Sequence, residues 1–253
     1  MSGVVRDCEQ VPERRAGNDS AAVREVIDAR DGCELFTLRT VRAVVGHSIA
    51  RETGAAEELL FVVSGRGTLV ASDGEQQLEP ETGVLLRSGD HYEIVNEGPA
   101  DIYCVAVALH QPDERSRAAT GLSRLGDRVA QSATADREFR IVFDADNDCP
   151  SATQFVGYIP VGAAPAHYHL YDEVIYVLDG NGVMHMGGKQ TPLRAGSAIS
   201  LPAREIHTLE NSGPGVMRVL GVFRPAGSPA AAFYPDGTPA STGATQQAQA
   251  LTT

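Results

Sequence analysis

The chain has 253 residues and a net charge of −12, and 42% of its residues are hydrophobic. This length allows one large domain or two domains of ordinary size. The acidic balance argues against a nucleic-acid partner, because no basic excess is available to neutralise phosphates. No segment reaches the roughly 18 apolar residues that a membrane span needs, so we expect no membrane partner either.

Cysteine usage indicates the compartment. The four cysteines are widely scattered and none forms a Cys-x-x-Cys pair. They are Cys8, Cys33, Cys104 and Cys149. Because the N-terminus also lacks an apolar leader, these features predict reduced thiols and a cytoplasmic location.

The first part of the chain predicts an arm followed by a β-rich domain. Residues 1–30 are polar and are expected to form an N-terminal arm that lays a strand on a neighbour. Residues 31–110 alternate short β-type segments with turn signals, a pattern typical of an all-β domain. Residues 111–138 carry few large apolar side chains and predict an interdomain connection with one helical stretch at 124–130.

The second part repeats the β-rich pattern. Residues 139–235 are expected to form a second β domain, in which Phe233 and Tyr234 complete the core. Residues 236–253 lack a core-forming pattern and are predicted to be disordered. Frequent glycine (26) and proline (14) residues agree with many short strands joined by turns.

An internal repeat relates the two β-rich blocks. A shift of 115 positions brings acidic, glycine and asparagine residues of the two halves into register. The aligned pairs are Glu58 with Glu173, Gly65 with Gly180, Gly67 with Gly182 and Asn96 with Asn211. Two matching blocks at one offset predict two domains of the same fold.

The second block contains a cluster of candidate metal ligands. His167, His169 and Glu173 are all odd-numbered, so an uninterrupted strand would place them on one face. A fourth candidate, His207, lies on a later predicted strand. Two or three imidazoles and a carboxylate suit one divalent first-row metal per chain, with iron, manganese, nickel, copper and zinc all acceptable.

The first block lacks this set. The 115-residue shift places Glu52, Gly54 and Tyr92 where the second block has His167, His169 and His207, and only Glu58 is retained. A single carboxylate does not hold a metal against water. We therefore expect the first domain to serve as a lid, a pairing surface or a separate small-molecule pocket.

These residues resemble the two motifs of the cupin family. The first appears as His167-x-His169-x3-Glu173-x6-Gly180, with Gly162 one residue closer than the family pattern. The second appears as Gly196-x5-Pro202-x-Arg204-x2-His207-x3-Asn211, with Arg204 replacing a glycine. The resemblance implies an all-β fold of two tandem cupin jelly-roll barrels, with metal ligands His167, His169, Glu173 and His207 in the C-terminal barrel.

The resemblance extends to two-cupin dioxygenases of the quercetin-cleaving kind, in which three histidines and one glutamate bind the metal. It implies a metal-dependent dioxygenase acting on a small organic substrate that coordinates the metal. One alternative is a non-oxidative lyase, isomerase or hydrolase, similar to ureidoglycine aminohydrolase, that uses the metal as a Lewis acid. Another alternative is a metal- or ligand-binding protein without turnover. Cupins often pair, so we expect a homodimer.

Three residues are candidates for substrate binding. Gln154 and Tyr158 precede the ligand strand and share parity, so they could face one pocket. Arg204 lies in the turn before His207, where it could meet an anionic substrate at the mouth of the barrel. The sequence assigns no separate catalytic residue.

Overall fold

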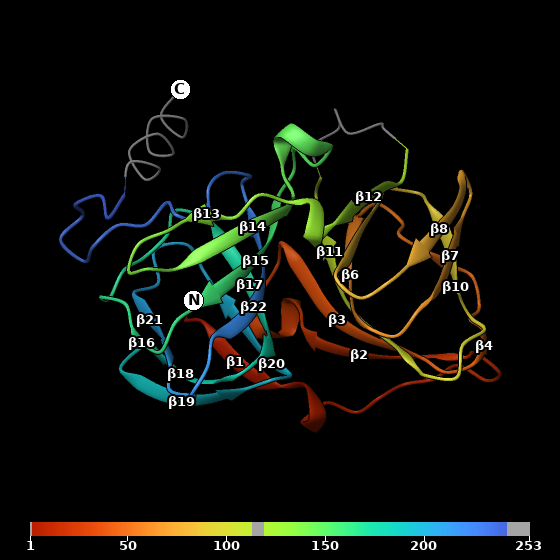
Figure 1. Cartoon of the computed structure of the whole chain (residues 1–253), viewed down its shortest axis with the longest axis horizontal. Helices are drawn as coiled ribbons and strands as arrows, with labels where there is room; N and C mark the ends of the chain where they lie inside the picture. The colour runs from red at the N-terminus through yellow and green to blue at the C-terminus, as the bar shows by residue number, and fades with distance from the viewer. Residues whose placement is uncertain (1, 113–118, 242–253) are drawn as a thin grey trace. The chain divides into compact units, whose positions relative to one another are not determined.

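The computed structural model describes residues 2–112 and 119–241, and these fold into two compact units (Figure 1). The N-terminal unit comprises Cys8–Asp127 and Asp146–Ser151. The C-terminal unit comprises the residues up to Asp7, Arg128–Ala145 and the chain from Ala152 onward. The only helices among the described residues are short 3₁₀-helices. They are η1 (Cys8–Gln10), η2 (Ala29–Asp31), η3 (Leu125–Asp127) and η4 (Ala145–Asn147). None of the described helices is both long and apolar enough to cross a membrane.

The N-terminal unit consists of two antiparallel sheets. Its six-stranded sheet has the order β12-β9-β6-β11-β3-β2. Its second sheet has the order β4-β10-β7-β8, with β5 also pairing β10. The strands are β2 (Ala21–Ile27), β3 (Phe36–Ala43), β4 (Gly46–His47), β5 (Arg51–Glu52), β6 (Glu57–Ser64), β7 (Gly67–Ala71), β8 (Gly74–Leu78), β9 (Thr82–Leu86), β10 (His91–Asn96), β11 (Ile102–Leu109) and β12 (Gly121–Arg124).

The C-terminal unit repeats this plan. Its seven-stranded sheet has the order β1-β20-β17-β22-β15-β14-β13, and its four-stranded sheet has the order β16-β21-β18-β19. The strands are β1 (Val4–Asp7), β13 (Gln131–Ser132), β14 (Glu138–Phe143), β15 (Thr153–Ile159), β16 (Gly162–Ala163), β17 (Asp172–Asp179), β18 (Asn181–Met186), β19 (Lys189–Arg194), β20 (Ser197–Leu201), β21 (His207–Asn211) and β22 (Met217–Arg224).

The core of the C-terminal unit lies between its two sheets. Ile175 and Val177 on β17 contact a buried cluster that includes Met184 of β18 and Leu209 of β21. Because side chains alternate along a strand, Glu173 lies on the same face of β17 as Ile175 and Val177 and enters the barrel interior. Each fully buried aliphatic side chain of this kind contributes roughly 1.5–3 kcal/mol. The predicted all-β, two-barrel fold is confirmed.

Two edge strands come from segments that were expected to lie outside the two β domains. Val4–Asp7, within the predicted arm, forms β1 and pairs with β20 of the C-terminal unit, where Val5 packs on the core. Gly121–Arg124, within the predicted connection, forms β12 and pairs with β9 of the N-terminal unit. The helical stretch expected at 124–130 is a single 3₁₀ turn, η3, whose central Gly126 disfavours an α-helix.

The C-terminal segment is ordered further than expected. Thr238 bonds to the Asp236 carboxylate, and the Ala240 amide donates to the carbonyl oxygen of Ala232 at 2.8 Å. The turn between them returns the chain toward the barrel, because Asp236 and Gly237 supply a turn sequence. The rest of the predicted tail, residues 242–253, lies outside the described residues.

Candidate metal centre

Backbone pairing brings the two histidine segments together. His167 and His207 form an isolated β-bridge, in which each amide donates to the other residue's carbonyl oxygen, at 3.1 and 2.9 Å. His207 is the first residue of β21, and Glu173 lies at the start of β17, opposite Leu201 of β20. The barrel therefore collects, at one end, residues that are far apart in the sequence.

Each histidine is oriented by a backbone carbonyl. The Nδ1 atoms of His167, His169 and His207 lie 2.8, 2.7 and 2.9 Å from the carbonyl oxygens of Pro165, Ala231 and Glu205. A carbonyl oxygen can only accept, so each Nδ1 carries the proton and each Nε2 keeps its lone pair. One ligating atom from each ring lies within 4.8 Å of the others. Three imidazole nitrogens this close together form a donor set that suits a first-row divalent metal.

The electrostatics of the cluster agree with this assignment. Burial is the main cause that lowers the pKa of all three rings, with a smaller effect from the nearby Arg137 charge. The pKa of His207 falls to about 3, with His167 as the second cause. The imidazoles are therefore neutral at physiological pH, and neutral imidazole is the form that binds a metal.

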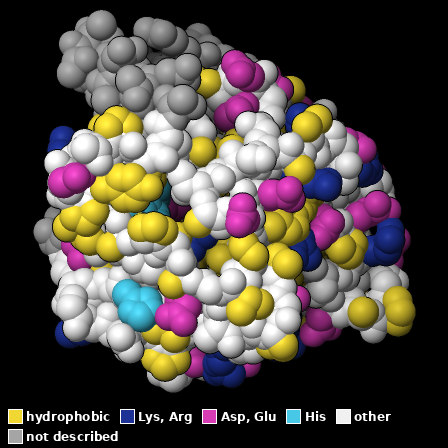
Figure 2. Space-filling view, turned by 60° about the vertical axis from the view of Figure 1, so that its left-hand side comes forward, with side chains coloured by type: hydrophobic (Ala, Val, Ile, Leu, Met, Phe, Trp, Pro, Cys, Tyr) yellow, Lys and Arg dark blue, Asp and Glu magenta, His cyan; other side chains and the backbone are white. Residues whose placement is uncertain are grey.

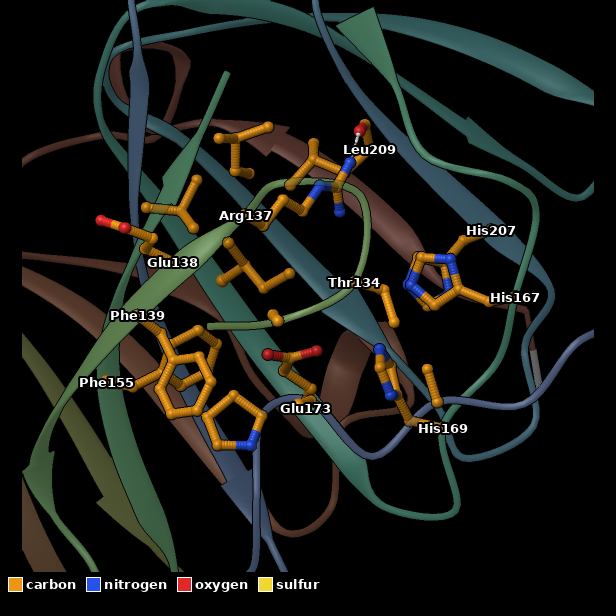
Figure 3. A pocket seen from close by; sticks show the side chains of 18 of the residues that line it. Thr134, Arg137, Glu138, Phe139, Phe155, His167, His169, Glu173, His207 and Leu209 are labelled. Carbon is orange, nitrogen blue, oxygen red and sulfur yellow. Dashed lines mark hydrogen bonds between the residues drawn. The ribbon is translucent and has the colours of Figure 1, made fainter. Parts of the chain in front are cut away.

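Glu173 lines the same cavity but does not join the three-histidine group. Its side chain is buried, and burial raises the pKa of its carboxyl group to about 8. Figure 3 shows the Glu173 carboxyl group among the side chains that line the cavity. Its Oε1 lies beside Gly221, where an added Cβ would approach it to 3.0 Å. Glycine at position 221 thus leaves space for the carboxyl group and for the ring of Phe155.

The cavity at the histidine cluster is small and has mostly apolar walls. Its free volume is about 90 Å³. In Figure 2, a histidine side chain is visible at the bottom of a hollow rimmed by hydrophobic side chains. The apolar walls include Phe139, Phe155, Ile175, Leu209 and Val219. A cavity of this size suits a ligand with few non-hydrogen atoms.

Two contributors to the site carry no signal in the sequence pattern. Arg137 lines the cavity, although it falls in the predicted interdomain connection. Ala231 supplies the carbonyl for His169 from a segment 62 residues away. His169 is also stacked on Tyr171, with ring centroids 4.6 Å apart and an interplanar angle of 9°. Only the folded barrel brings Arg137 and Ala231 to the motif, whereas Tyr171 lies within it.

The structure differs from expectation at Gln154 and Tyr158. Phe155, Gly157 and Ile159 of β15 line the cavity, so the even-numbered residues lie on the opposite face of the strand. Gln154 is fully buried there, and the Tyr158 ring is contacted by the Arg218 guanidinium at 5.7 Å. The two residues share a face, as predicted from parity, but that face is not the one that meets the histidines.

Arg204 is exposed and does not line the cavity. Its backbone has φ = 68°, which is the left-handed conformation that glycine adopts without penalty. Its amide donates to the His169 carbonyl oxygen at 2.7 Å, so the turn supports the ligand segment through its backbone. Arg204 thus adopts a backbone conformation that suits glycine better than arginine.

This conformation predicts that Arg204→Gly increases the free energy of unfolding by up to about 1 kcal/mol, because the Cβ clash disappears. Urea denaturation of the variant and the parent protein measures the difference. Arg204→Ala is the matched control, since it removes the guanidinium but keeps the Cβ, and should give no gain. A Gly variant less stable than the Ala variant would contradict the strain argument.

The corresponding place in the N-terminal unit is occupied differently. The Tyr92 hydroxyl donates to the Glu58 carboxylate at 2.8 Å. Strand pairing sets Arg51 opposite Tyr92, whereas His167 lies opposite His207 in the C-terminal unit. Arg51 rather than Glu52 therefore corresponds to His167, because the N-terminal unit has one more residue before β6 than the C-terminal unit has before β17. Arg51 is paired with Asp19 at 2.7 Å. This unit has a separate open cavity, lined by Arg39, Glu58 and His110 among others.

Comparison with known proteins agrees with this geometry. Residues 154–223 match the family model of the cupin domain. An oxalate-binding protein of Thermotoga maritima is 38% identical over 51 residues, a match that spans 20% of this chain and only 42% of the relative. The fold of the whole chain resembles that of the protein Ylba from E. coli (TM-score 0.73, 12% identity, 87% and 90% of the two chains). It also resembles an oxalate decarboxylase of Lactobacillus farciminis (TM-score 0.70, 12% identity, 87% and 85%). Residues 154–223, which contain the histidine segments, therefore match a cupin domain, and the similarity to these solved structures shows a shared fold.

Proposed function

We propose that this chain is a metal-dependent two-barrel cupin enzyme, with one divalent first-row metal held in the C-terminal unit by His167, His169 and His207. Glu173, in the same cavity, is the candidate fourth ligand. The observation that carries the proposal is the set of three Nδ1–carbonyl hydrogen bonds, which leaves three Nε2 lone pairs for one ion. When bound, such a metal supplies a Lewis acid and open coordination positions.

The residues of the chain have their own tasks in this proposal. The carbonyl of Ala231 and the ring of Tyr171 hold the His169 imidazole in one orientation. Phe155 and Ile175 contribute apolar wall, which limits water around a bound substrate. The small cavity favours a substrate of few atoms over a polycyclic one. Within this class we propose oxygenation of a small organic compound as the reaction.

Metal analysis of the purified full chain by mass spectrometry tests the site. We expect about one transition metal per chain, and we expect the His167→Ala/His169→Ala variant to lose it because two of three donors are removed. The matched control is His47→Ala/His91→Ala in the N-terminal unit, which should keep the metal, since both histidines are exposed there. Two metals per chain, or metal retained by the first variant, would contradict the proposed centre.

Oxygen uptake over small phenolic and enolic compounds then tests the reaction. Uptake that requires the intact histidine set supports oxygenation. Turnover without oxygen consumption would replace it by non-oxidative chemistry at the same metal.

Ligand binding without turnover is the second candidate function. It is favoured by the name of the Thermotoga maritima relative, which is called an oxalate-binding protein. A metal-loaded chain that binds small carboxylates and converts none of the tested compounds would favour this function.

A further inference from the structure

Arg137 is the cationic side chain of the cavity. It ends a tight turn, in which the Ala133 amide donates to the Arg137 carbonyl oxygen at 2.8 Å, and it directly precedes β14. Its guanidinium Nη2 donates to the carbonyl oxygen of Leu209, two residues after His207 on β21 (Figure 3). This hydrogen bond fixes the guanidinium beside the histidine cluster.

Among residues 2–112 and 119–241, no carboxylate forms an ion pair with Arg137. The neighbouring Glu138 is exposed, and in Figure 3 its carboxylate points away from the guanidinium. Glu173 lines the cavity and forms no ion pair with the arginine. By contrast, Arg194 of the same unit is paired with Asp7 at 2.8 Å. Arg137 is partly buried, and a partly buried guanidinium without a partner anion keeps an uncompensated charge that a bound anion would offset.

The side chain of Arg137 lines the same cavity as His167, His169 and His207. A guanidinium has five N–H donors, and the Leu209 carbonyl uses one of them. The remaining donors form the planar fork that matches a carboxylate.

We propose that Arg137 binds the carboxylate of the substrate, while a second oxygen on the adjacent carbon of the substrate faces the histidine cluster. The ligand class is therefore small 2-hydroxy, 2-oxo or dicarboxylic acids. This inference rests on the proposed function, because it assigns the substrate class of the same metal site. The cavity volume of about 90 Å³ and the apolar walls restrict the rest of the molecule to a few carbon atoms.

Calorimetric titration of the metal-loaded full chain with glycolate and with glycolamide tests the proposal. The two probes share a hydroxyl group and a carbonyl oxygen, but only glycolate carries the charge. The parent protein should prefer glycolate, and Arg137→Met should reduce this preference by roughly 10- to 100-fold, the loss expected for a charge-assisted hydrogen bond. Glycolamide affinity should change little, because a neutral amide gains less from the guanidinium.

Two further variants make the result specific. Arg137→Lys keeps the charge but not the fork, and should give an intermediate preference even if the Met variant folds poorly. Arg204→Gln removes an exposed arginine outside the cavity, and should leave the preference unchanged.

The outcomes separate this proposal from the proposed function. An unchanged preference in both Arg137 variants, or a metal-loaded parent protein without any preference, would overturn the carboxylate subsite and leave the metal centre standing. A parent protein that takes up no metal would instead overturn the metal centre. Metal content is measured for each protein before titration.

Discussion

A chain that ends at Ser228 is expected to lose metal affinity by at least roughly 10- to 100-fold, the usual effect of removing a group that orients a ligand. The deleted segment contains the Ala231 carbonyl that holds the Nδ1 proton of His169. It also contains Pro229, Ala230 and Ala232, which form one wall of the cavity. Without them the His169 ring loses its fixed tautomer and the site opens to water.

Titration with Co²⁺, followed by its visible absorbance, measures this effect. The matched control ends at Ser241 and lacks only residues 242–253, so it should bind Co²⁺ like the full chain. Circular dichroism of both proteins checks that the β-structure remains. Equal Co²⁺ affinity of the two truncated proteins would show that the segment does not support the centre.

The second large effect concerns Glu173 in metal-free protein. Burial raises its folded-state pKa from 4.5 to about 8. Because the folded-state pKa is raised, the protonated carboxyl group contributes fully to the stability of the folded protein below pH 4.5. This contribution is lost as the pH rises toward 8. Removing the ionisable group by Glu173→Gln should therefore stabilise the chelator-treated protein at pH 8 by a few kcal/mol, because each tenfold change in the ionisation constant corresponds to about 1.4 kcal/mol.

Urea denaturation of the parent and Gln proteins between pH 4.5 and pH 8.5 measures this difference. The advantage of the variant should be absent at pH 4.5 and grow with pH. The buried histidines titrate in both proteins, so their contribution cancels in the comparison. Glu138→Gln is the control, because this cavity glutamate is exposed and should give no pH-dependent gain. A difference that is constant with pH would contradict the buried-acid interpretation.

The local part of the site was predictable from the sequence. His167 and His169 lie in one short segment, and the odd-numbered pattern with Glu173 predicts that all three enter one cavity. The repeat with a 115-residue shift predicts two domains of one fold, and the structure shows two units with the same sheet plan. The three residues share the cavity although they do not lie on one uninterrupted strand, because the chain bends at residues 170 and 171 before β17 begins at Asp172.

The remainder depended on tertiary structure. On β15 nearly every residue is buried, so the sequence contains no alternation to show whether Gln154 or Phe155 meets the cavity. The position of Arg137 depends on a hydrogen bond to Leu209, 72 residues later. The candidate metal ligands could be found by spacing, whereas the groups that orient them and the cation beside them could not.

The position of β1 bears on whether the protein can be divided. The first strand of the chain completes the sheet of the C-terminal unit, although the next residues, from Cys8, belong to the N-terminal unit. A cut near residue 128 would therefore produce a C-terminal fragment whose β20 exposes unpaired backbone groups, and an N-terminal fragment with an unused Val4–Asp7 strand. Exposed edges of this kind pair with any available strand. Separately expressed fragments should therefore recognise each other through this strand, and a C-terminal fragment expressed alone should self-associate.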